Sequence, residues 1–332
     1  MTVALKVHFF LSLLFAALST ALPFSNNDAV ATIWTFPNET WVENLAVRQN
    51  GAVLCTSISR AAIYQVDPFS HVAATVHQFD ILDGVLGIAE IENDIFVAVT
   101  ATIDLATNMA KNGSAKIWRV DMCAWSLGAP NPISLISNLP EVGLPDGVTP
   151  LPTDPGVVLV ADADKGLIWR VSTTTGAHTI AISDPAFKYT SPLVPIGVNG
   201  LKILDDELYF TNLAANLIAR IPITANGSAS GSVQKVSTET LLPDDFALAG
   251  DGTIYAAGYN TLWRVMPDGT TDALVGGPNS TAVQGITSAQ FGRTREDGGV
   301  LYISTTGGLL LAPAGARVHG GQLLAVNVGL FG

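Results

Sequence analysis

Charged residues are scarce in this chain: only 13% of its 332 residues are Asp, Glu, Lys or Arg. Acids outnumber bases 28 to 16, and the formal net charge is −12. Such a surface has no electrostatic basis for binding nucleic acid or an anionic membrane. Because 48% of the residues are hydrophobic, the chain can bury the core of one large domain or two small ones.

Cysteine is almost absent, with Cys55 and Cys123 alone. There is no CxxC motif and no Cys/His cluster, which argues against a zinc site. Two buried small apolar side chains are the favoured interpretation, and a single disulfide in an oxidising compartment stays open. The sequence also lacks a recognisable catalytic triad, a phosphate-binding loop, a cofactor fingerprint and any long helical periodicity.

The N-terminus is typical of a secretory signal. Lys6 is its only charge, an apolar run from Val7 to Leu18 follows, and Ser19-Thr20-Ala21 suits a cleavage site. The run is too short for a favoured membrane anchor. We therefore expect a signal peptide over 1–21 and a secreted or secretory-pathway protein. Four N-x-S/T sequons then predict glycosylation, at Asn38, Asn112, Asn226 and Asn279.

Internal repeats indicate the fold. The segment Ile117-Trp118-Arg119-Val120 recurs from Ile168 and from Leu262, with weaker copies from Ile63, Ile218 and Leu323. Six copies spaced by roughly 50 residues predict an all-β, six-bladed β-propeller. Flanking β-rich segments give four strands per blade. We expect one domain over 28–332, with the ring closed by an N-terminal strand over 31–36 that completes the last blade.

Aligning the expected innermost strands produces a polar column. Its members are Glu43, Leu86, Asp146, Asn199, Asp244 and Gln284. The residue after each member is mostly glycine, which lets backbones crowd together. Because inner strands surround the axis of a propeller, we expect one column to form a ring at one mouth of the central channel. Asp245 stands in the glycine column, where it could support Asp244 by hydrogen bonds.

The repeats and the ring resemble the SMP-30/gluconolactonase/strictosidine-synthase superfamily of six-bladed propellers. In its gluconolactonase branch, a divalent metal, often calcium, is held by residues that match Glu43, Asn199 in Asn199-Gly200-Leu201, and Asp244 in Pro243-Asp244. That resemblance implies a metal-dependent lactonase, in which the ion polarises a lactone carbonyl and a carboxylate activates water. Asp245 replaces the glycine that this branch carries after its aspartate.

A second resemblance covers nearly the whole mature chain. The segments Trp41 to Arg48, Asn199-Gly200-Leu201-Lys202, Asp244 to Leu248 and Thr287 to Thr294 are similar to those of fungal secreted propellers. The described branch of that group consists of hetero-Diels–Alderases of tropolone–sesquiterpene meroterpenoid biosynthesis. The resemblance implies a cyclase that joins an o-quinone methide to a humulene-type polyene.

A cycloaddition needs two oriented reactants and a hydrogen-bond donor on the heterodiene carbonyl, with no cofactor. Asn199 and Gln284 are candidate donors, and Glu43, Asp146 or Asp244 could expel water from a benzylic alcohol precursor. We favour this interpretation, with small apolar substrates and a monomeric protein. The calcium-dependent lactonase and a binding propeller without chemistry remain as alternatives.

Overall fold

The computed structural model describes residues 29–80, 83–126, 128–129, 131–239, 241–310, 312–313 and 315–331. The expected signal peptide over 1–21 lies outside these residues. Two short 3-10 helices, Pro185–Phe187 and Val328–Phe331, accompany the strands. No helix within the described ranges has the length and apolarity to cross a membrane.

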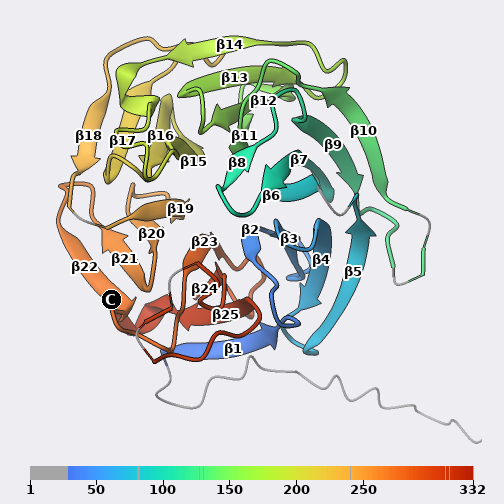
Figure 1. Ribbon diagram of the computed structural model, residues 1–332, viewed down its shortest axis with the longest axis vertical. Helices are drawn as coiled ribbons and strands as arrows, with labels where there is room; N and C mark the ends of the chain where they lie inside the picture. The colour runs from blue at the N-terminus through green and yellow to red at the C-terminus, as the bar shows by residue number, and fades with distance from the viewer. Residues whose placement is uncertain are drawn as a thin grey trace, which may run out of the picture.

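Six antiparallel sheets surround a common axis, which is the expected six-bladed propeller (Figure 1). Blade 1 contains β2 (Val42–Val47), β3 (Val53–Ser57), β4 (Ala62–Asp67) and β5 (Val72–Gln78). Blade 2 contains β6 (Asp83–Glu92), β7 (Ile95–Asp104), β9 (Lys116–Asp121) and β10 (Ile133–Asn138), with β8 (Met109–Ala110) paired to β7. Blade 3 contains β11 (Pro145–Leu151), β12 (Asp154–Asp162), β13 (Leu167–Ser172) and β14 (His178–Ser183).

The second half of the ring repeats this order. Blade 4 contains β15 (Val198–Leu204), β16 (Glu207–Asn212), β17 (Leu217–Pro222) and β18 (Gln234–Ser237). Blade 5 contains β19 (Pro243–Leu248), β20 (Ile254–Gly258), β21 (Thr261–Val265) and β22 (Thr271–Gly276). Blade 6 contains β23 (Ile286–Phe291), β24 (Val300–Thr305), β25 (Gln322–Asn327) and the N-terminal β1 (Val30–Thr35).

The N-terminal strand closes the ring, as the sequence predicted. β1 pairs with β25 in antiparallel register, with Ala31 opposite Ala325. In Figure 1 the blue strand β1 lies along the outer side of the red strand β25. The pairing covers the free edge of β25 and so removes an open edge from the sheet.

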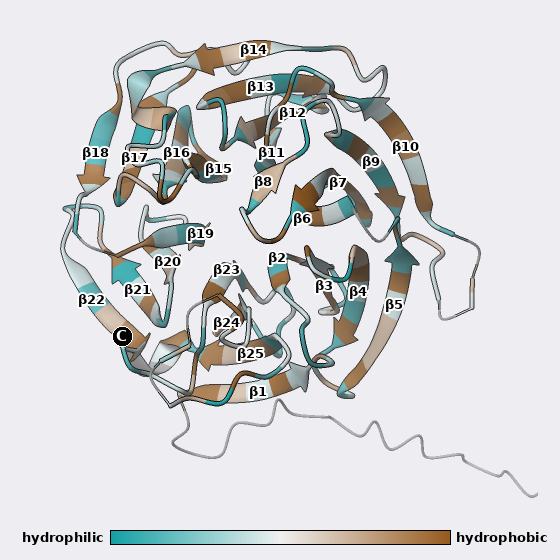
Figure 2. Ribbon diagram, viewed as in Figure 1, coloured by the Kyte–Doolittle hydropathy of each residue, from teal (hydrophilic) through white to brown (hydrophobic). Residues whose placement is uncertain are grey.

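The core lies between neighbouring blades rather than inside any one of them. One cluster joins Val97 and Ile117 of blade 2 to Val158 and Trp169 of blade 3, and similar clusters fill the other junctions. The outer strand β10 mixes apolar residues with serine and asparagine, which gives its bands in Figure 2. Because each blade buries both faces against its neighbours, the axis is left to the innermost strands.

The two cysteines differ. Cys55 is fully buried in β3, as expected, whereas Cys123 is exposed after β9, and both thiols are free. The expectation of two buried cysteines is therefore wrong for Cys123, which lies in a surface turn rather than a strand. The asparagines of all four sequons are exposed, which glycosylation requires, and their glycosylation stays a prediction.

Candidate functional site

In each blade, the pairing of the innermost strand with the next strand is interrupted by a register shift near the start of the innermost strand. In blades 1 to 5 the pairing register shifts across a two-residue step, such as the step between Val42 and Leu45. Such irregularities turn side chains away from the regular pleat. The step residues include Glu43, Asp146 and Asp244, so the local break aims the polar column into the channel.

The polar column has a different member in blade 6. There the register shift follows Ile286, so Thr287 takes the place that Glu43 has in blade 1. Gln284 precedes this strand by two residues, and its amide nitrogen lies near Thr281 O, Arg317 O and His319 Nε2. The placement of Gln284 in the ring was therefore a register error of three residues. The sequence Gln284-Gly285-Ile286 has the same polar-Gly-aliphatic pattern as the register-shift residues of other blades, such as Asn199-Gly200-Leu201. The segment that lies at the shift in blade 6, Thr287-Ser288-Ala289, has no glycine, so the pattern pointed to the wrong residues.

The four other predicted polar residues meet at one mouth of the channel. Glu43, Asp146, Asn199 and Asp244 line a single cavity of about 400 Å³, which we name the acid lobe. The remaining wall is mostly aliphatic, with exposed residues at the rim, and it also includes Trp41, Thr107 and Asn108. The inner wall includes Ile58, Leu86, Ile103, Leu144, Ile196 and Leu213, and the rim includes Leu193, Val194 and Leu310.

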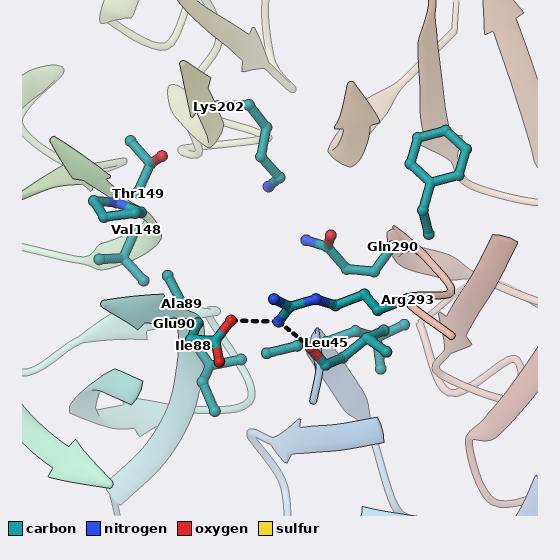
Figure 3. A pocket seen from close by; sticks show the side chains of 13 residues that line it. Leu45, Ile88, Ala89, Glu90, Val148, Thr149, Lys202, Gln290 and Arg293 are labelled. Atoms are coloured by element: carbon teal, nitrogen blue, oxygen red, sulfur yellow. Dashed lines mark hydrogen bonds and ion pairs between the residues drawn. The ribbon is translucent and has the colours of Figure 1, made fainter. Parts of the chain in front are cut away.

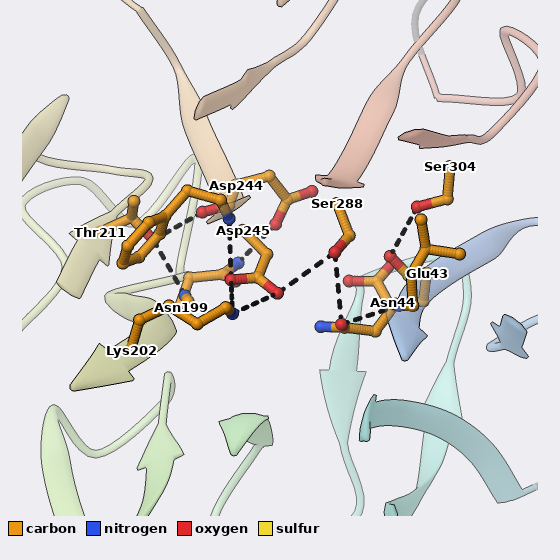
Figure 4. Close-up of polar contacts among 12 residues, drawn as sticks. Glu43, Asn44, Asn199, Lys202, Thr211, Asp244, Asp245, Ser288 and Ser304 are labelled. Carbon is orange, nitrogen blue, oxygen red and sulfur yellow. Dashed lines mark hydrogen bonds and ion pairs between the residues drawn. The ribbon is translucent and has the colours of Figure 1, made fainter. Parts of the chain in front are cut away.

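Hydrogen bonds fix the polar floor of the acid lobe. Trp41 Nε1 donates to Glu43 Oε2 at 2.5 Å. Asn199 Nδ2 donates to Asp244 Oδ1 at 2.8 Å, and Figure 4 shows these two side chains side by side. Asp146 is 4% exposed, and its Oδ1 has no hydrogen-bond partner among the described residues. A buried polar atom without a partner is costly, so Asp146 is a candidate to bind a ligand, as is Asn108, whose Oδ1 in the same wall also lacks a partner among the described residues.

The acid lobe favours neutral carboxyl groups. Burial raises the pKa of Asp146 to about 7, with a further contribution from the charge of Asp245. Burial, followed by repulsion from Asp244 and Asp146, raises the pKa of Glu43 well above its usual range. Burial and the charge of Asp146 do the same to the pKa of Asp244. Near neutral pH this cluster can therefore donate hydrogen bonds, which ionised carboxylates cannot do.

Asp245, the second aspartate of the pair, faces away from the acid lobe. Lys202 Nζ donates to its two oxygens at 2.8 and 3.1 Å, and Ser288 Oγ donates to Oδ2 at 3.2 Å. Ser288 also donates to Asn44 Oδ1 at 3.3 Å, which continues the chain of contacts across the channel (Figure 4). Asp245 thus has a cationic partner, which Asp244 lacks among the described residues.

The opposite mouth holds a second cavity, of about 310 Å³. Lys202, Glu90 and Arg293 line it, and Arg293 Nη1 donates to Glu90 Oε2 and to Val47 O (Figure 3). Acidic and basic side chains are paired here.

A metal ion at the acid lobe was the lactonase expectation. Within the described ranges, no group of three or more His, Cys, Asp or Glu side chains is arranged to hold a metal ion. Asn199 also turns its amide NH₂ towards Asp244, where a shared calcium ion would require the amide oxygen. Because one of the three expected ligands is an amide, the absence of such a group does not bear on the set of Glu43, Asn199 and Asp244, and their binding of calcium stays an expectation.

Fold comparisons define the class of protein. The structure resembles regucalcin of Agrobacterium tumefaciens (TM-score 0.62, 16% identity, 89% of this chain and 92% of that one). It also resembles a gluconolactonase, XC5397, of Xanthomonas campestris (TM-score 0.63, 13% identity, 94% and 92%). These likenesses show the fold, which is the six-bladed propeller described above. These identities are too low to transfer an activity, and no family model matches the sequence.

Sequence comparisons define the family. The chain is 30% identical over 325 residues to "Putative hetero-Diels-Alderase asR5" of Sarocladium schorii, covering 86% of this chain and 79% of the relative. It is 29% identical over 306 residues to a "Putative hetero-Diels-Alderase" of a Phoma species, covering 84% and 86%. The chain belongs to this family of fungal propellers.

Two residues of the acid lobe's surroundings were missed by sequence reasoning. Trp41 fixes Glu43 from two positions upstream, and Thr287 completes the ring in blade 6, where its hydroxyl donates to Val42 O at 2.9 Å. Both lie in segments whose resemblance to fungal propellers was evident. A tryptophan two residues before a buried acid is a signal that could have pointed to the first contact.

Proposed function

We propose that this protein catalyses an intermolecular hetero-Diels–Alder cycloaddition between an o-quinone methide and a humulene-type polyene. The observation that supports it is a largely apolar cavity whose buried carboxyl groups contact no basic side chain in the described part of the chain, together with membership of the family. Such a cavity binds uncharged reactants and still offers acidic hydrogen-bond donors.

The reaction forms two bonds and releases nothing. The exocyclic carbon and the carbonyl oxygen of the o-quinone methide bond to the two alkene carbons, which gives a dihydropyran ring. Negative charge grows on the carbonyl oxygen as the carbon–carbon bond forms first. The protonated carboxyl group of Asp146 donates a hydrogen bond to this oxygen, since Asp146 has an oxygen that is otherwise unpartnered.

The same acids can generate the heterodiene. An ortho-hydroxybenzyl alcohol becomes an o-quinone methide when the benzylic C–O bond breaks, water leaves and the phenolic proton is lost. One protonated carboxyl group, such as that of Asp146, gives its proton to the leaving hydroxyl. The carboxylate that this leaves on Asp146 then takes the phenolic proton, so the cluster keeps its number of protons.

Binding both reactants in one cavity removes much of the entropy cost of their encounter. The aliphatic wall of the acid lobe holds the ring faces by burial, and the carboxyl floor orients the carbonyl end. One face of the heterodiene then meets the alkene, so the product forms as one enantiomer.

The test uses the purified mature chain with 2-hydroxybenzyl alcohol as precursor and α-humulene as alkene. Chiral chromatography of the adducts measures rate and enantiomeric excess against a protein-free reaction. An excess of one enantiomer that is retained in the surface control Glu92→Gln supports the proposal, because Glu92 is exposed on the β6–β7 turn. A racemic adduct at the uncatalysed rate, or hydrolysis of sugar and aryl lactones without any effect on the adducts, overturns it.

A further inference from the structure

A smaller cavity, of about 160 Å³, adjoins the acid lobe. The two cavities share Val194, Leu213, Asp244 and Leu310 in their walls. We name the smaller cavity the apolar lobe. Because the walls are shared, the two lobes form one site with Asp244 at their boundary.

The composition of the apolar lobe differs from that of its neighbour. Leu242, Tyr259 and Ile286 line it, and none of them lines the acid lobe. Apart from Asp244 at the boundary, its wall holds no carboxyl group. Burial of hydrocarbon is the main source of binding free energy that such a surface can supply.

One polar group in the apolar lobe stands out. Thr306 is 1% exposed, and its Oγ1 makes no hydrogen bond within the described part of the chain. The other threonine of the lobe, Thr287, has its hydroxyl bonded to Val42 O and to Ser304 Oγ. A buried hydroxyl without a partner costs about 1–3 kcal/mol, so a ligand oxygen that reaches Thr306 would gain by completing the pair.

The backbone keeps this hydroxyl in place. Thr306 N donates to Gly285 O at 2.7 Å, and a Cβ at position 285 would lie 2.1 Å from Thr306 Oγ1. Gly285 also has φ +68, a left-handed conformation that glycine adopts without strain. No other side chain fits at position 285 without moving Thr306.

Two residues with strained backbones complete the lobe. Leu242 has φ +49 and Tyr259 has φ +59, which is rare for residues with a Cβ. Each follows or precedes a strand of blade 5 and lines the apolar lobe. Strain of this kind persists where the surrounding structure fixes it, and it is common at ligand sites.

We propose that the apolar lobe binds the hydrocarbon partner of the reaction, and that Thr306 hydrogen-bonds to a single alcohol or ketone oxygen on that hydrocarbon. The heterodiene occupies the acid lobe, and the reacting carbons meet beside Asp244. The assignment of two reactants rests on the proposed function. The oxygen preference rests on Thr306 itself and concerns binding alone.

The test measures binding without turnover. Farnesol, its deoxygenated counterpart farnesene, and 2-hydroxybenzyl alcohol are titrated into the protein and followed by calorimetry. Thr306→Val removes the hydroxyl at nearly constant shape and should weaken farnesol binding about tenfold. Binding of farnesene and of the benzyl alcohol should stay unchanged. The matched control Thr179→Val, at an exposed position of β14, should alter none of the three.

A second variant protects the test against a failure to fold. Leu242 is 40% exposed, so Leu242→Trp can narrow the apolar lobe from its rim. It should weaken farnesol and farnesene alike and spare the benzyl alcohol. Equal effects of Thr306→Val on farnesol and farnesene, or a Leu242→Trp effect on the benzyl alcohol alone, would overturn the lobe assignment.

These outcomes are separable from the fate of the proposed function. If no cycloadduct forms but Thr306→Val still discriminates farnesol from farnesene, the oxygen preference of the apolar lobe stands and the proposed reaction fails. If cycloaddition occurs but the variants do not discriminate, the lobe assignment fails alone.

Discussion

The two mouths of the central channel differ in whether their acidic side chains contact basic ones. At the opposite mouth, Glu90 pairs with Arg293, and inside the channel Asp245 pairs with Lys202. At the acid lobe, Asp146 and Asp244 contact no basic side chain among the described residues, and their pKa values are raised. The adjacent aspartates Asp244 and Asp245 therefore differ in their surroundings, because only Asp245 contacts a cation.

The largest expected effect is that of Asp146→Asn on cycloaddition. The amide keeps the shape of the carboxyl group but is a much weaker acid, so it stabilises the developing oxyanion less and cannot protonate a leaving hydroxyl. The rate of adduct formation should fall about 100-fold or more. Circular dichroism and the melting temperature verify that the fold is retained. An unchanged rate would show that Asp146 does not contact the reactants.

The substitution Lys202→Met removes the ion pair between Lys202 and Asp245. Asp245 is buried, and its cation is removed by this change. We expect the free energy of unfolding to fall by about 3 kcal/mol, because an unpaired buried charge remains. The double variant Lys202→Met/Asp245→Asn should recover most of the loss. The control Arg293→Gln, in a more exposed pair, should cost less than about 1 kcal/mol. A loss in the double variant as large as in the single one would contradict the argument.

For Asp146, which has no cationic partner among the described residues, we expect the contribution to stability to fall as pH rises. Asp146 has a pKa of about 7 in the folded protein, far above the usual value that it regains on unfolding. Its contribution to stability is full below the unfolded pKa and is lost as pH rises through about 7. Asp146→Asn should therefore stabilise the protein at pH 8 relative to pH 4, by about 2 kcal/mol or more. Urea unfolding of both proteins at the two pH values measures the contribution of Asp146 together with its effect on the pKa values of Glu43 and Asp244.

Cycloaddition should follow the same protonation. If the neutral form of Asp146 is the donor, the rate falls as pH rises through about 7. The measurement is the initial rate of enantiomerically enriched adduct between pH 5 and pH 9, corrected for the protein-free reaction. A rate that rises across this window would assign catalysis to an ionised carboxylate.

The smallest expected effect is that of a chelator. Since the proposed cycloaddition relies on hydrogen-bond donors rather than on a Lewis acid, prolonged dialysis against EDTA should leave the adduct rate and the melting temperature unchanged. Added calcium should likewise have no effect. A loss of activity that calcium restores would instead support the calcium-dependent alternative.

Much of the architecture could be predicted from the sequence because the repeats carry it. The Trp-Arg segments around Trp118 and Trp169 mark equivalent strands, and the polar column follows from their spacing. The sequence alignment placed Gln284 in the ring because it followed the local glycine pattern. The position of Thr287 depends on the register between β23 and β24, which the sequence does not reveal. The apolar lobe was beyond sequence reasoning, because Thr306 and Leu242 lie outside the repeating pattern and meet only in the closed ring.

Ring closure also sets the order of events during synthesis. The first strand, β1, pairs with the last, β25, so Ala31 can reach its place opposite Ala325 only after nearly the whole chain has been synthesised. Until then β1 has no edge to join, and blade 6 cannot form. Contacts of such long sequence separation slow folding. The nascent chain therefore carries an unfinished blade through nearly all of its translation, and the acid lobe, framed by inner strands from around the ring, is completed last.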